Sequence, residues 1–493
     1  MRIGTNVAAI VANNALQKSQ NNLSTSIERL SSGYKINGSK DDAAGCAISE
    51  KMRAQIRGLS QAQNNTADGV SVLNTAEGAI TEIQSMLTRL KELSVQAAND
   101  VNSDDEREAI QKEIEQINNE IDRISDQTEF NTQSLINGNL SRRVYSDLQG
   151  VNQLSVSDSY TAGVYGITVT EDARQAIAVG AGSITMSSTA SITEEQAGAI
   201  NINGYKISIS EGDTLDKVMG KIIDGVNITG GSAFTVKDLN NDTVANGTDY
   251  AGYVPTADYA GSTLVIMTNQ YGSDQKMNIT CDNAELADIL GIPQAATQDG
   301  IYVEGSDVKA EIATGDDGKR IGFADSAILS TKGTVITVTD VNNKEFSMDV
   351  PGNAAGTVFD DSNNDGQSAA GAGTARTISQ EVTDVGTMSI HVGANQDQVI
   401  VIDIPAITTY SLGTEHMNVM TQYTASRAIS TVDEAINKTN KIRSRIGAYE
   451  NRFDHTTNNL EVSSENLTKS LSTMIDTDMS EEMTTYTSET VLT

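Results

Sequence analysis

The sequence predicts an α+β fold: long antiparallel coiled-coil helices from both termini, with a β-rich middle region inserted between them. Apolar residues recur at alternating spacings of three and four in the first and last parts of the 493-residue chain, the period of helices that pack along a narrow seam. The middle carries short alternating runs among Gly, Ser, Thr and Asp, a pattern typical of strands and turns. All four prolines lie between residues 255 and 405, so no proline interrupts the terminal helices.

Residues 1–42 are predicted to form an N-terminal core helix and a linker. The apolar residues that share one face of this helix are Leu16, Leu23, Ile27 and Leu30. Gly33 suits the C-terminal cap of the helix, because glycine adopts the left-handed conformation readily. Ser39, followed by Asp42, is expected to cap the next helix. This leaves a linker of about six residues, so the two helices point in different directions.

Residues 43–139 are predicted to form the N-terminal coiled-coil helices. The seam of the first helix consists of Leu73, Ala76, Ile80, Ile83, Leu87, Leu90, Ser94 and Ala97. Ser103 and Glu106 have the spacing of a capping box, so a second helix is expected to begin there. The apolar face of this second helix is formed by Ile110, Ile114, Ile117, Ile121 and Ile124.

The C-terminal part of the chain is also predicted to contain a long helix with an apolar seam. Residues 388–475 are predicted to form a β-hairpin and a C-terminal coiled-coil helix, and residues 476–493 a shortened C-terminal core segment. The helical seam is Val432, Ala435, Ile442, Ile446, Tyr449, Phe453, Leu460, Leu467, Leu471 and Met474. A helix with one apolar stripe needs a partner to cover it, so we expect the N-terminal and C-terminal helices to pack on each other.

Residues 140–387 form the β-rich region. Asn203-Gly204 between alternating runs is a strong hairpin signal. Further strands are expected in "TLVIM", "KMNIT", "TVITVT" and "EFSMDV", and short helices at residues 215–223 and 284–290. The region contains 33 acidic and 14 basic residues, which favours a solvated, self-repelling face.

Composition and motifs exclude several classes of function. A net charge of −32 disfavours nucleic acid and anionic membranes as partners, and neither a membrane-spanning run nor a cleavable signal is evident. Cys46 and Cys281 are expected to be small buried apolar residues. Only three histidines occur, none of them in a zinc-protease motif. "GDDGKRIG" has the wrong spacing for a phosphate loop and "DSNNDG" reads as a surface turn, so we expect no enzyme activity, cofactor or metal site.

At the linker after Gly33, called the joint below, and in the residues that follow it, the chain resembles bacterial flagellins. The resemblance is carried by "IERLSSGYKINGSKDDAAGCAISEKMRAQIRGLSQAQNNTADGVSVLNTAEGAI", "EIDRISDQTEFNTQSLING" and "IGAYENRFDHTTNNLEVSSENLTKSLSTMIDTDMSEEM". In the middle region, "INGYKISISEGDTLDKVMGKIIDGVN" looks like a short module of some flagellins. The resemblance implies a homopolymeric flagellar filament for motility, with the terminal helices inside and the variable middle outside.

The resemblance also implies partners and a location. They are the flagellar export chaperone and the type III export apparatus, the filament cap and hook-associated proteins, and the chain is expected to be secreted to the bacterial flagellum. Family members normally continue beyond "DTDMSEEM" as a longer helix that pairs with the N-terminal one. We therefore expect a short core pairing here and poor assembly of the chain as written.

Some flagellins are sensed by an animal Toll-like receptor through R-x-x-E-L-x-V-Q. The matching residues here are Arg89, Glu92, Leu93, Val95 and Gln96, with Glu113 on the next helix. Arg89, Leu93 and Glu113 are therefore receptor-binding candidates. The alternative is that Leu93 only packs between helices and that Arg89 only forms surface ion pairs.

Three other functions are alternatives to a filament subunit. A hook-filament junction (hook-associated) protein is the main alternative, although the "LSSG…DDAAG" and "QTEFN" motifs favour the filament protein. A flagellin with an enzyme in its middle would need a catalytic constellation, and a surface adhesin with a stalk would need an anchor or a signal.

Overall fold

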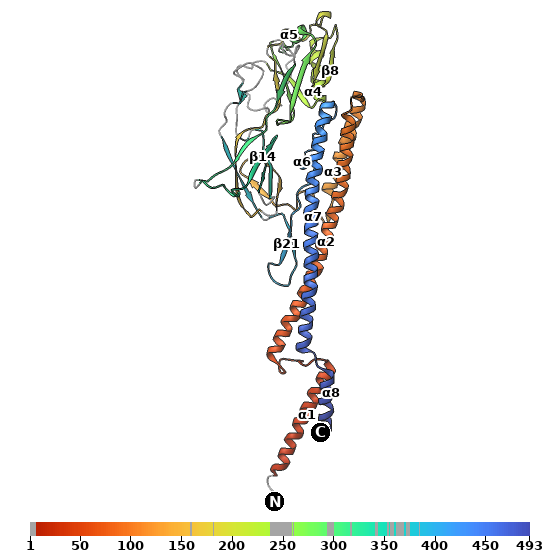
Figure 1. Cartoon of the computed structure of the whole chain (residues 1–493), viewed down its shortest axis with the longest axis vertical. Coiled ribbons are helices and arrows are strands. Elements are labelled where there is room, and N and C mark those ends of the chain that lie inside the picture. The colour runs from red at the N-terminus through yellow and green to blue at the C-terminus, as the bar shows by residue number, and fades with distance from the viewer. Residues whose placement is uncertain are drawn as a thin grey trace. The chain divides into compact units, whose positions relative to one another are not determined.

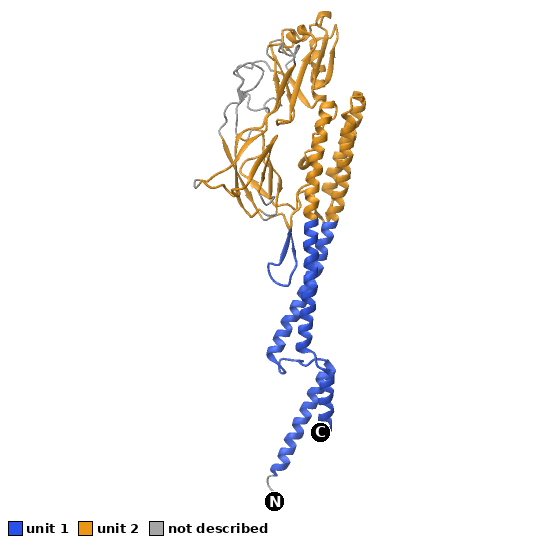
Figure 2. Cartoon of the chain, in the orientation of Figure 1, with its two compact units in different colours: residues 1–74, 389–401, 447–493 blue, residues 75–388, 402–446 orange. Residues whose placement is uncertain are grey.

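The chain was studied as a computed structural model (Figure 1). The structure describes residues 6–493 except 158–159, 181, 237–258, 260, 293–299, 316–317, 341–343, 353, 355–358, 361–368, 371–374 and 384. The chain divides into two compact units (Figure 2), which are residues 1–74, 389–401 and 447–493 in unit 1 and residues 75–388 and 402–446 in unit 2. Helical terminal segments and a β-rich middle confirm the predicted fold class.

The elements follow one another in a simple order. The helices of the described residues are α1 (Val7–Ser32), α2 (Ala43–Ala97), α3 (Asp104–Gln127), α4 (Leu215–Ile228), α5 (Ala284–Ile289), α6 (Thr409–Leu412), α7 (Gln422–Ile475) and α8 (Met479–Leu492), with a 3-10 turn η1 (Glu194–Gln196). The strands up to the middle of the chain are β1 (Glu129–Phe130), β2 (Gln133–Ser134), β3 (Val144–Ser146), β4 (Asn152–Val156), β5 (Gly163–Glu171), β6 (Ile177–Val179), β7 (Gly198–Ile202), β8 (Tyr205–Ile209), β9 (Gly231–Val236), β10 (Thr263–Thr268) and β11 (Lys276–Cys281). The later strands are β12 (Ile301–Glu304), β13 (Lys309–Ile312), β14 (Ile328–Lys332), β15 (Val335–Thr339), β16 (Glu345–Asp349), β17 (Phe359–Asp360), β18 (Ala369–Ala370), β19 (Arg376–Val382), β20 (Met388–His391) and β21 (Val399–Ile402).

In unit 1 the two terminal helices α1 and α8 lie side by side (Figure 1). Arg29 Nη1 lies 3.6 Å from Glu482 Oε2, and the Asn22 side chain donates a hydrogen bond to Glu489 Oε1 at 2.9 Å. Later positions of α1 therefore meet earlier positions of α8. The two helices are antiparallel, as expected for ends of the chain that pack on each other.

The joint after α1 follows the prediction only in part. Gly33 adopts φ 75° and donates its N–H to the Arg29 carbonyl at 2.8 Å, which confirms it as the C-terminal cap of α1. The prediction that Ser39 caps α2 is wrong. The Asp42 carboxylate accepts the N–H groups of Ala44 and Gly45, each at 3.0 Å. Because a capping side chain reaches only two or three residues ahead, Asp42 and not Ser39 caps α2, which begins at Ala43.

The joint is paired with the segment between α7 and α8. Tyr34 forms an antiparallel bridge with Asp476. The Lys35 N–H donates to the Ile475 carbonyl at 2.6 Å, and the Thr477 N–H donates to the Gly33 carbonyl at 3.0 Å. The two connections of unit 1 are therefore joined by backbone hydrogen bonds.

The first part of α2 and the last part of α7 also pack together in unit 1. Leu59, Ala62 and Leu460 form a small buried cluster, with Ala394 of the β20–β21 hairpin packed against it. The strands of this hairpin confirm the prediction for "MSIHVGANQDQVIVIDIP". Gly69 lies under the Phe453 ring, and a Cβ atom there would approach the ring to 3.1 Å.

The predicted seams are the buried faces of the long helices. Every predicted seam residue of α2 is buried, namely Leu73, Ala76, Ile80, Ile83, Leu87, Leu90, Ser94 and Ala97. In α7 the predicted seam is buried from Val432 to Leu460, whereas the later members Leu467, Leu471 and Met474 are only partly covered. Burial at heptad spacing confirms that these stripes are the contact faces.

Side-chain contacts fix the direction of α2 against α7 in unit 2. The three contacts are Arg443 Nη2 with Glu77 Oε1 at 3.3 Å, Gln84 Nε2 with Asn440 Oδ1 at 3.1 Å, and Lys91 Nζ with Asp433 Oδ1 at 2.6 Å. As the residue numbers rise along α2, the numbers of the contacting residues on α7 fall. The two helices are therefore antiparallel.

The third helix of this group begins and packs largely as predicted. Ser103 and Glu106 form the capping box at the start of α3, which confirms the prediction. Its buried apolar side chains are Ile110, Ile114 and Ile121, whereas Ile117 and Ile124 are only partly buried. Asn118 is buried beside them and donates to the Thr414 carbonyl at 2.8 Å. This bond ties α3 to the segment before α7.

The middle region contains two β-rich parts. In the first, the sheets β12-β11-β7-β8 and β6-β10-β9 share a core with α4 and α5. In the second, the sheets β13-β5-β19-β3 and β14-β15-β16-β4 share another core, which contains an aromatic cluster of Tyr160, Tyr165, Phe323 and Phe346. The predicted strands and both predicted short helices are confirmed, with α4 extending to Ile228.

The predicted turn between β7 and β8 is also confirmed. Asn203 and Gly204 have φ values of 50° and 90°, and β7 pairs with β8 in antiparallel register. Positive φ at both central residues is the requirement of this two-residue turn.

Of the two cysteines, Cys281 is buried as predicted, but Cys46 is only partly buried.

Candidate assembly and recognition surfaces

The receptor candidates Arg89 and Glu113 form one exposed cluster across α2 and α3. Arg89 Nε and Nη2 donate to Glu113 Oε1 at 3.0 and 2.8 Å, and Arg89 Nη1 donates to Glu92 Oε2 at 3.1 Å. The hydrogen bonds that Arg89 donates to the Glu113 and Glu92 carboxylates raise the pKa of Arg89 above its usual value. The cluster presents a fixed guanidinium between two carboxylates at the surface.

Leu93 does not belong to this exposed cluster. Its side chain is 1% exposed, because it faces the packed side of α2. Val95 is 53% exposed, on the outer side of the same helix. The motif therefore divides into outward residues, which include Arg89, Glu92 and Val95, and an inward Leu93. Direct contact between Leu93 and a receptor does not fit this placement.

The exposed faces of α1 and α8 are rich in large apolar side chains. Those on α1 are Val7, Ile10, Val11, Leu16 and Ile27, and those on α8 are Met479, Met483, Val491 and Leu492. Large exposed apolar residues in such number on two paired helices indicate an interaction surface. At about 3.6 residues per turn, Val7, Ile10 and Val11 share one side of α1, and Leu16 and Ile27 lie on the other. This set of nine side chains is called the terminal apolar face below.

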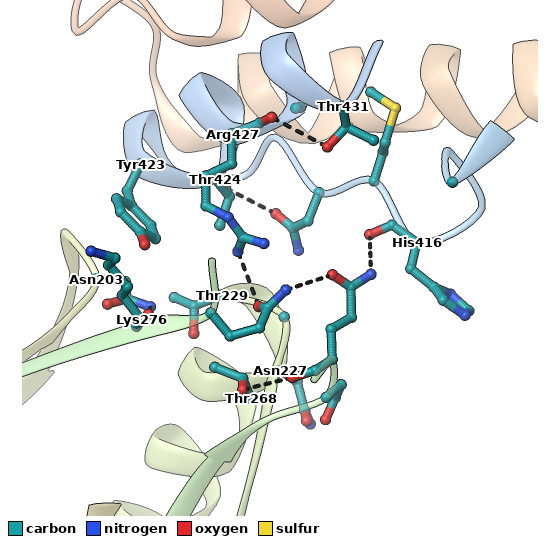
Figure 3. A pocket seen from close by; sticks show the side chains of 18 residues that line it. Asn203, Asn227, Thr229, Thr268, Lys276, His416, Tyr423, Thr424, Arg427 and Thr431 are labelled. Carbon is teal, nitrogen blue, oxygen red and sulfur yellow. Dashed lines mark hydrogen bonds between the residues drawn. The ribbon is translucent and has the colours of Figure 1, made fainter. Parts of the chain in front are cut away.

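A cavity of about 510 Å³ lies in unit 2, between the first β-rich part and the start of α7 (Figure 3). Its lining is mostly amide and hydroxyl groups, with Lys276 and Arg427 as the lysine and arginine side chains. The sequence carries no signal for this site. Its residues come from four separated segments, each of which reads only as a turn, a strand end or a helix end.

No metal site emerges from the part of the chain that the structure describes. That part contains no group of three or more His, Cys, Asp or Glu placed to hold a metal ion. "DSNNDG" and the two aspartates of "GDDGKRIG" lie outside the described residues. Among the described helices, none combines the length and the apolar character that crossing a membrane requires.

Comparison with known proteins identifies both helical ends of the chain. The family descriptions "Bacterial flagellin N-terminal helical region" and "Bacterial flagellin C-terminal helical region" match residues 3–141 and 429–493. The flagellin of Salmonella typhimurium is 30% identical over 98% of this chain and 93% of its own length. Polar flagellin A of Vibrio parahaemolyticus is 28% identical over 100% of this chain and 93% of its own length.

The similarity to solved structures is weak. FliC from Burkholderia pseudomallei is 14% identical with a TM-score of 0.23, over 78% of this chain and 99% of that chain. The assignment rests on the sequence matches, which cover both termini and nearly the full length of a relative. The chain belongs to the bacterial flagellin family, whose members are structural subunits of the flagellar filament and not enzymes.

Proposed function

We propose that the chain assembles with further copies of itself through the terminal apolar face, and that the short core pairing expected from the sequence makes this assembly weak. The observation that supports this proposal is the exposure of large apolar side chains on α1 and α8 in the single chain. α1 and α8 pair with each other, yet Val11 remains 62% exposed and Val491 81% exposed. Burial of such a side chain stabilises an interface by roughly 1.5–3 kcal/mol when it is complete. A second copy offers the same face and therefore a matching apolar surface.

The proposal includes the partners expected of an exported filament subunit. The flagellar export chaperone and the type III export apparatus would handle the chain before assembly, and the filament cap and hook-associated proteins would meet it in the filament. Apolar terminal helices suit such helix-binding partners. The net charge of −32 disfavours nucleic acid and anionic membrane surfaces.

The test compares two charged substitutions at exposed apolar positions. Val11→Asp lies on α1 in the terminal apolar face, and Ile328→Asp is a matched control on β14, where the side chain is 72% exposed. Both variants should keep the folded monomer, because neither side chain is buried. Val11→Asp should reduce sedimentable polymer at least about tenfold, and Ile328→Asp should leave it unchanged. Equal polymer from wild type and Val11→Asp would contradict the proposal.

We also propose that Arg89 and Glu113 contact an innate immune Toll-like receptor. In support, both side chains are about half exposed and hold each other in place through two hydrogen bonds. Preorganised charged groups at a surface lose little side-chain freedom on binding. Leu93 would act from inside, by holding the α2 backbone that carries Arg89.

The receptor proposal is tested by binding of the full chain to the purified receptor ectodomain. Arg89→Asp should weaken binding at least about tenfold. Arg123→Asp is the control, because Arg123 is an exposed arginine on α3 that pairs with Glu120 and not with Glu113. Unchanged affinity of Arg89→Asp would refute the contact. A hook-filament junction role stays the alternative prediction from the sequence, and no observation on the described residues favours it.

A further inference from the structure

We propose that the 510 Å³ cavity of unit 2 binds an acidic saccharide, with a uronic acid carboxylate held by Arg427. The volume lies within the roughly 300–1,000 Å³ of small-molecule sites. The wall on the β side comes from the ends of α4, β10 and β11, and the opposite wall comes from the segment before α7 and its first turns.

Three hydrogen bonds hold the two walls of the cavity together. The Asn418 side chain donates to the Ile228 carbonyl at 3.0 Å. Gln270 Nε2 donates to the His416 carbonyl at 3.4 Å, and Arg427 Nη1 donates to Gln275 Oε1 at 3.1 Å. Figure 3 shows the bonds at Arg427 and His416 crossing between the two walls. The cavity is therefore a formed site within unit 2, with fixed distances between its polar groups.

The lining matches a ligand that is rich in hydroxyl groups. Asparagine, glutamine and threonine side chains dominate it, and among its lining residues there is no carboxylate. This is unusual in a chain with 66 acidic residues. The side chains of Thr229, Thr268 and Thr424 are buried in the lining of the cavity. Amides and hydroxyls both donate and accept hydrogen bonds, as a sugar does, whereas an apolar ligand would leave them without partners.

The charges of the cavity favour an acid over a neutral sugar. Lys276 is paired with Glu304 at 2.8 Å, so its charge is already matched. Arg427 makes no ion pair with any residue that the structure describes, and its guanidinium bonds to a neutral amide. A guanidinium binds a carboxylate through two parallel hydrogen bonds. A uronic acid would supply the missing anion.

A second cavity adjoins the first and determines the orientation that we propose for the bound saccharide. It has a volume of about 340 Å³ and shares Asn203, Lys276 and Tyr423 with the first. Tyr205 and Tyr302 line it, which gathers three of the chain's 14 tyrosines around one groove. Aromatic rings offer apolar faces with a polar edge, and a sugar ring packs on such a face.

The acidic end of the saccharide belongs in the first cavity. Asp100 and Asp104 line the second cavity and lie 3.9 and 4.0 Å from its arginine, Arg107. The positive charge there is therefore already matched, whereas the charge of Arg427 is not. The assignment is therefore a uronic acid at Arg427, followed by a neutral sugar ring among the tyrosines.

The experiment titrates the full chain with methyl β-D-glucuronide and, as the neutral match, methyl β-D-glucoside, followed by ligand-observed NMR. The glucuronide should bind with a dissociation constant at least about tenfold lower than that of the glucoside. Arg427→Gln should remove this preference. Arg452→Gln, an exposed arginine of α7 outside the cavity, should keep it.

A second variant covers the case in which Arg427→Gln disturbs the packing of the walls. Asn227 is exposed at the cavity edge (Figure 3), and Asn227→Asp should weaken glucuronide binding several-fold by repulsion. Three results would overturn the proposal: no glucuronide binding up to about 20 mM, equal binding of the two glycosides, or unchanged glucuronide affinity in both Arg427→Gln and Asn227→Asp.

Discussion

Lys91 and Asp433 form an ion pair between α2 and α7, with Lys91 Nζ 2.6 Å from Asp433 Oδ1 across 342 positions of the sequence. Both side chains are nearly half exposed, so water screens the pair. Leu87 lies one turn before Lys91 on α2 and is fully buried. The two neighbours therefore have different roles: the pair helps to set the register of the helices, and the leucine supplies the stability.

The first prediction compares these two residues. Lys91→Ala should lower the free energy of unfolding by less than about 1 kcal/mol, because exposed ion pairs contribute little. Leu87→Ala should lower it by about 2–5 kcal/mol, because it leaves a cavity in the seam. Urea unfolding followed by circular dichroism measures both. Equal losses in the two variants would mean that the seam does not carry the helix pairing.

The second prediction concerns the start of α2. Asp42→Ala removes the side chain that accepts the Ala44 and Gly45 N–H groups, and should cost about 1 kcal/mol of stability. Ser39→Ala should change little, because Ser39 lies before the cap and outside the helix. Thermal unfolding of both variants tests the difference. A larger loss of stability from Ser39→Ala than from Asp42→Ala would contradict this assignment and favour Ser39 as the cap of α2.

The third prediction uses two glycines that both have open space beside them. Gly204 has φ 90° and Gly220 lies inside α4, and a Cβ atom at either position meets nothing within 4 Å. Gly204→Ala should destabilise by about 1 kcal/mol, because alanine is strained at positive φ. Gly220→Ala should stabilise by roughly 0.5–1 kcal/mol, because glycine is a poor helix former. Opposite shifts of the melting temperature are expected, and shifts of the same sign would contradict the turn assignment.

The fourth prediction is a pH dependence at Asp213, whose side chain is buried beside two lysines. Hydrogen bonds from Lys217 and Lys221, at 2.7 and 2.6 Å, and from the Ser210 N–H hold the pKa of Asp213 well below its usual value. A lowered folded-state pKa stabilises the fold above the unfolded-state value of about 3.9, and this stabilisation is lost as the pH falls toward the folded-state pKa. Asp213→Asn should therefore lower the melting temperature at pH 7.

The control for this prediction is Asp224→Asn on the exposed face of the same helix, which should have a much smaller effect at pH 7. The gap between wild type and Asp213→Asn should narrow below about pH 4, as the wild-type carboxylate becomes protonated. A gap that stays constant from pH 7 to about pH 3 would show that the lysine contacts are not electrostatic.

Much of the fold could be predicted because its signals are local or strictly periodic. The α2 seam from Leu73 to Ala97 repeats at heptad spacing, and such spacing places every member on one face. The Asn203-Gly204 turn and the Ser103–Glu106 capping box are specified within four residues. Each of these predictions depends only on neighbours along the chain.

The remaining features depend on tertiary packing. Ser39 and Asp42 both suit a helix cap, and only the start of α2 at Ala43 decides between them. Leu93 fits a recognition motif, but the rotation of α2 in its bundle turns it inward. The cavity at Arg427 unites segments about 200 positions apart, such as Asn227 and Arg427, and no periodicity connects them.

The backbone bridge between Tyr34 and Asp476 has a mechanical consequence. The chain passes this level of unit 1 twice, once toward α2 and once toward α8, and the bonds of Lys35 and Thr477 tie the two passages together. Twisting either connecting segment would break the backbone hydrogen bonds that join it to the other. The two segments therefore resist twisting together. A filament subunit gains from such a double connection, because a single strand would rotate freely at this point.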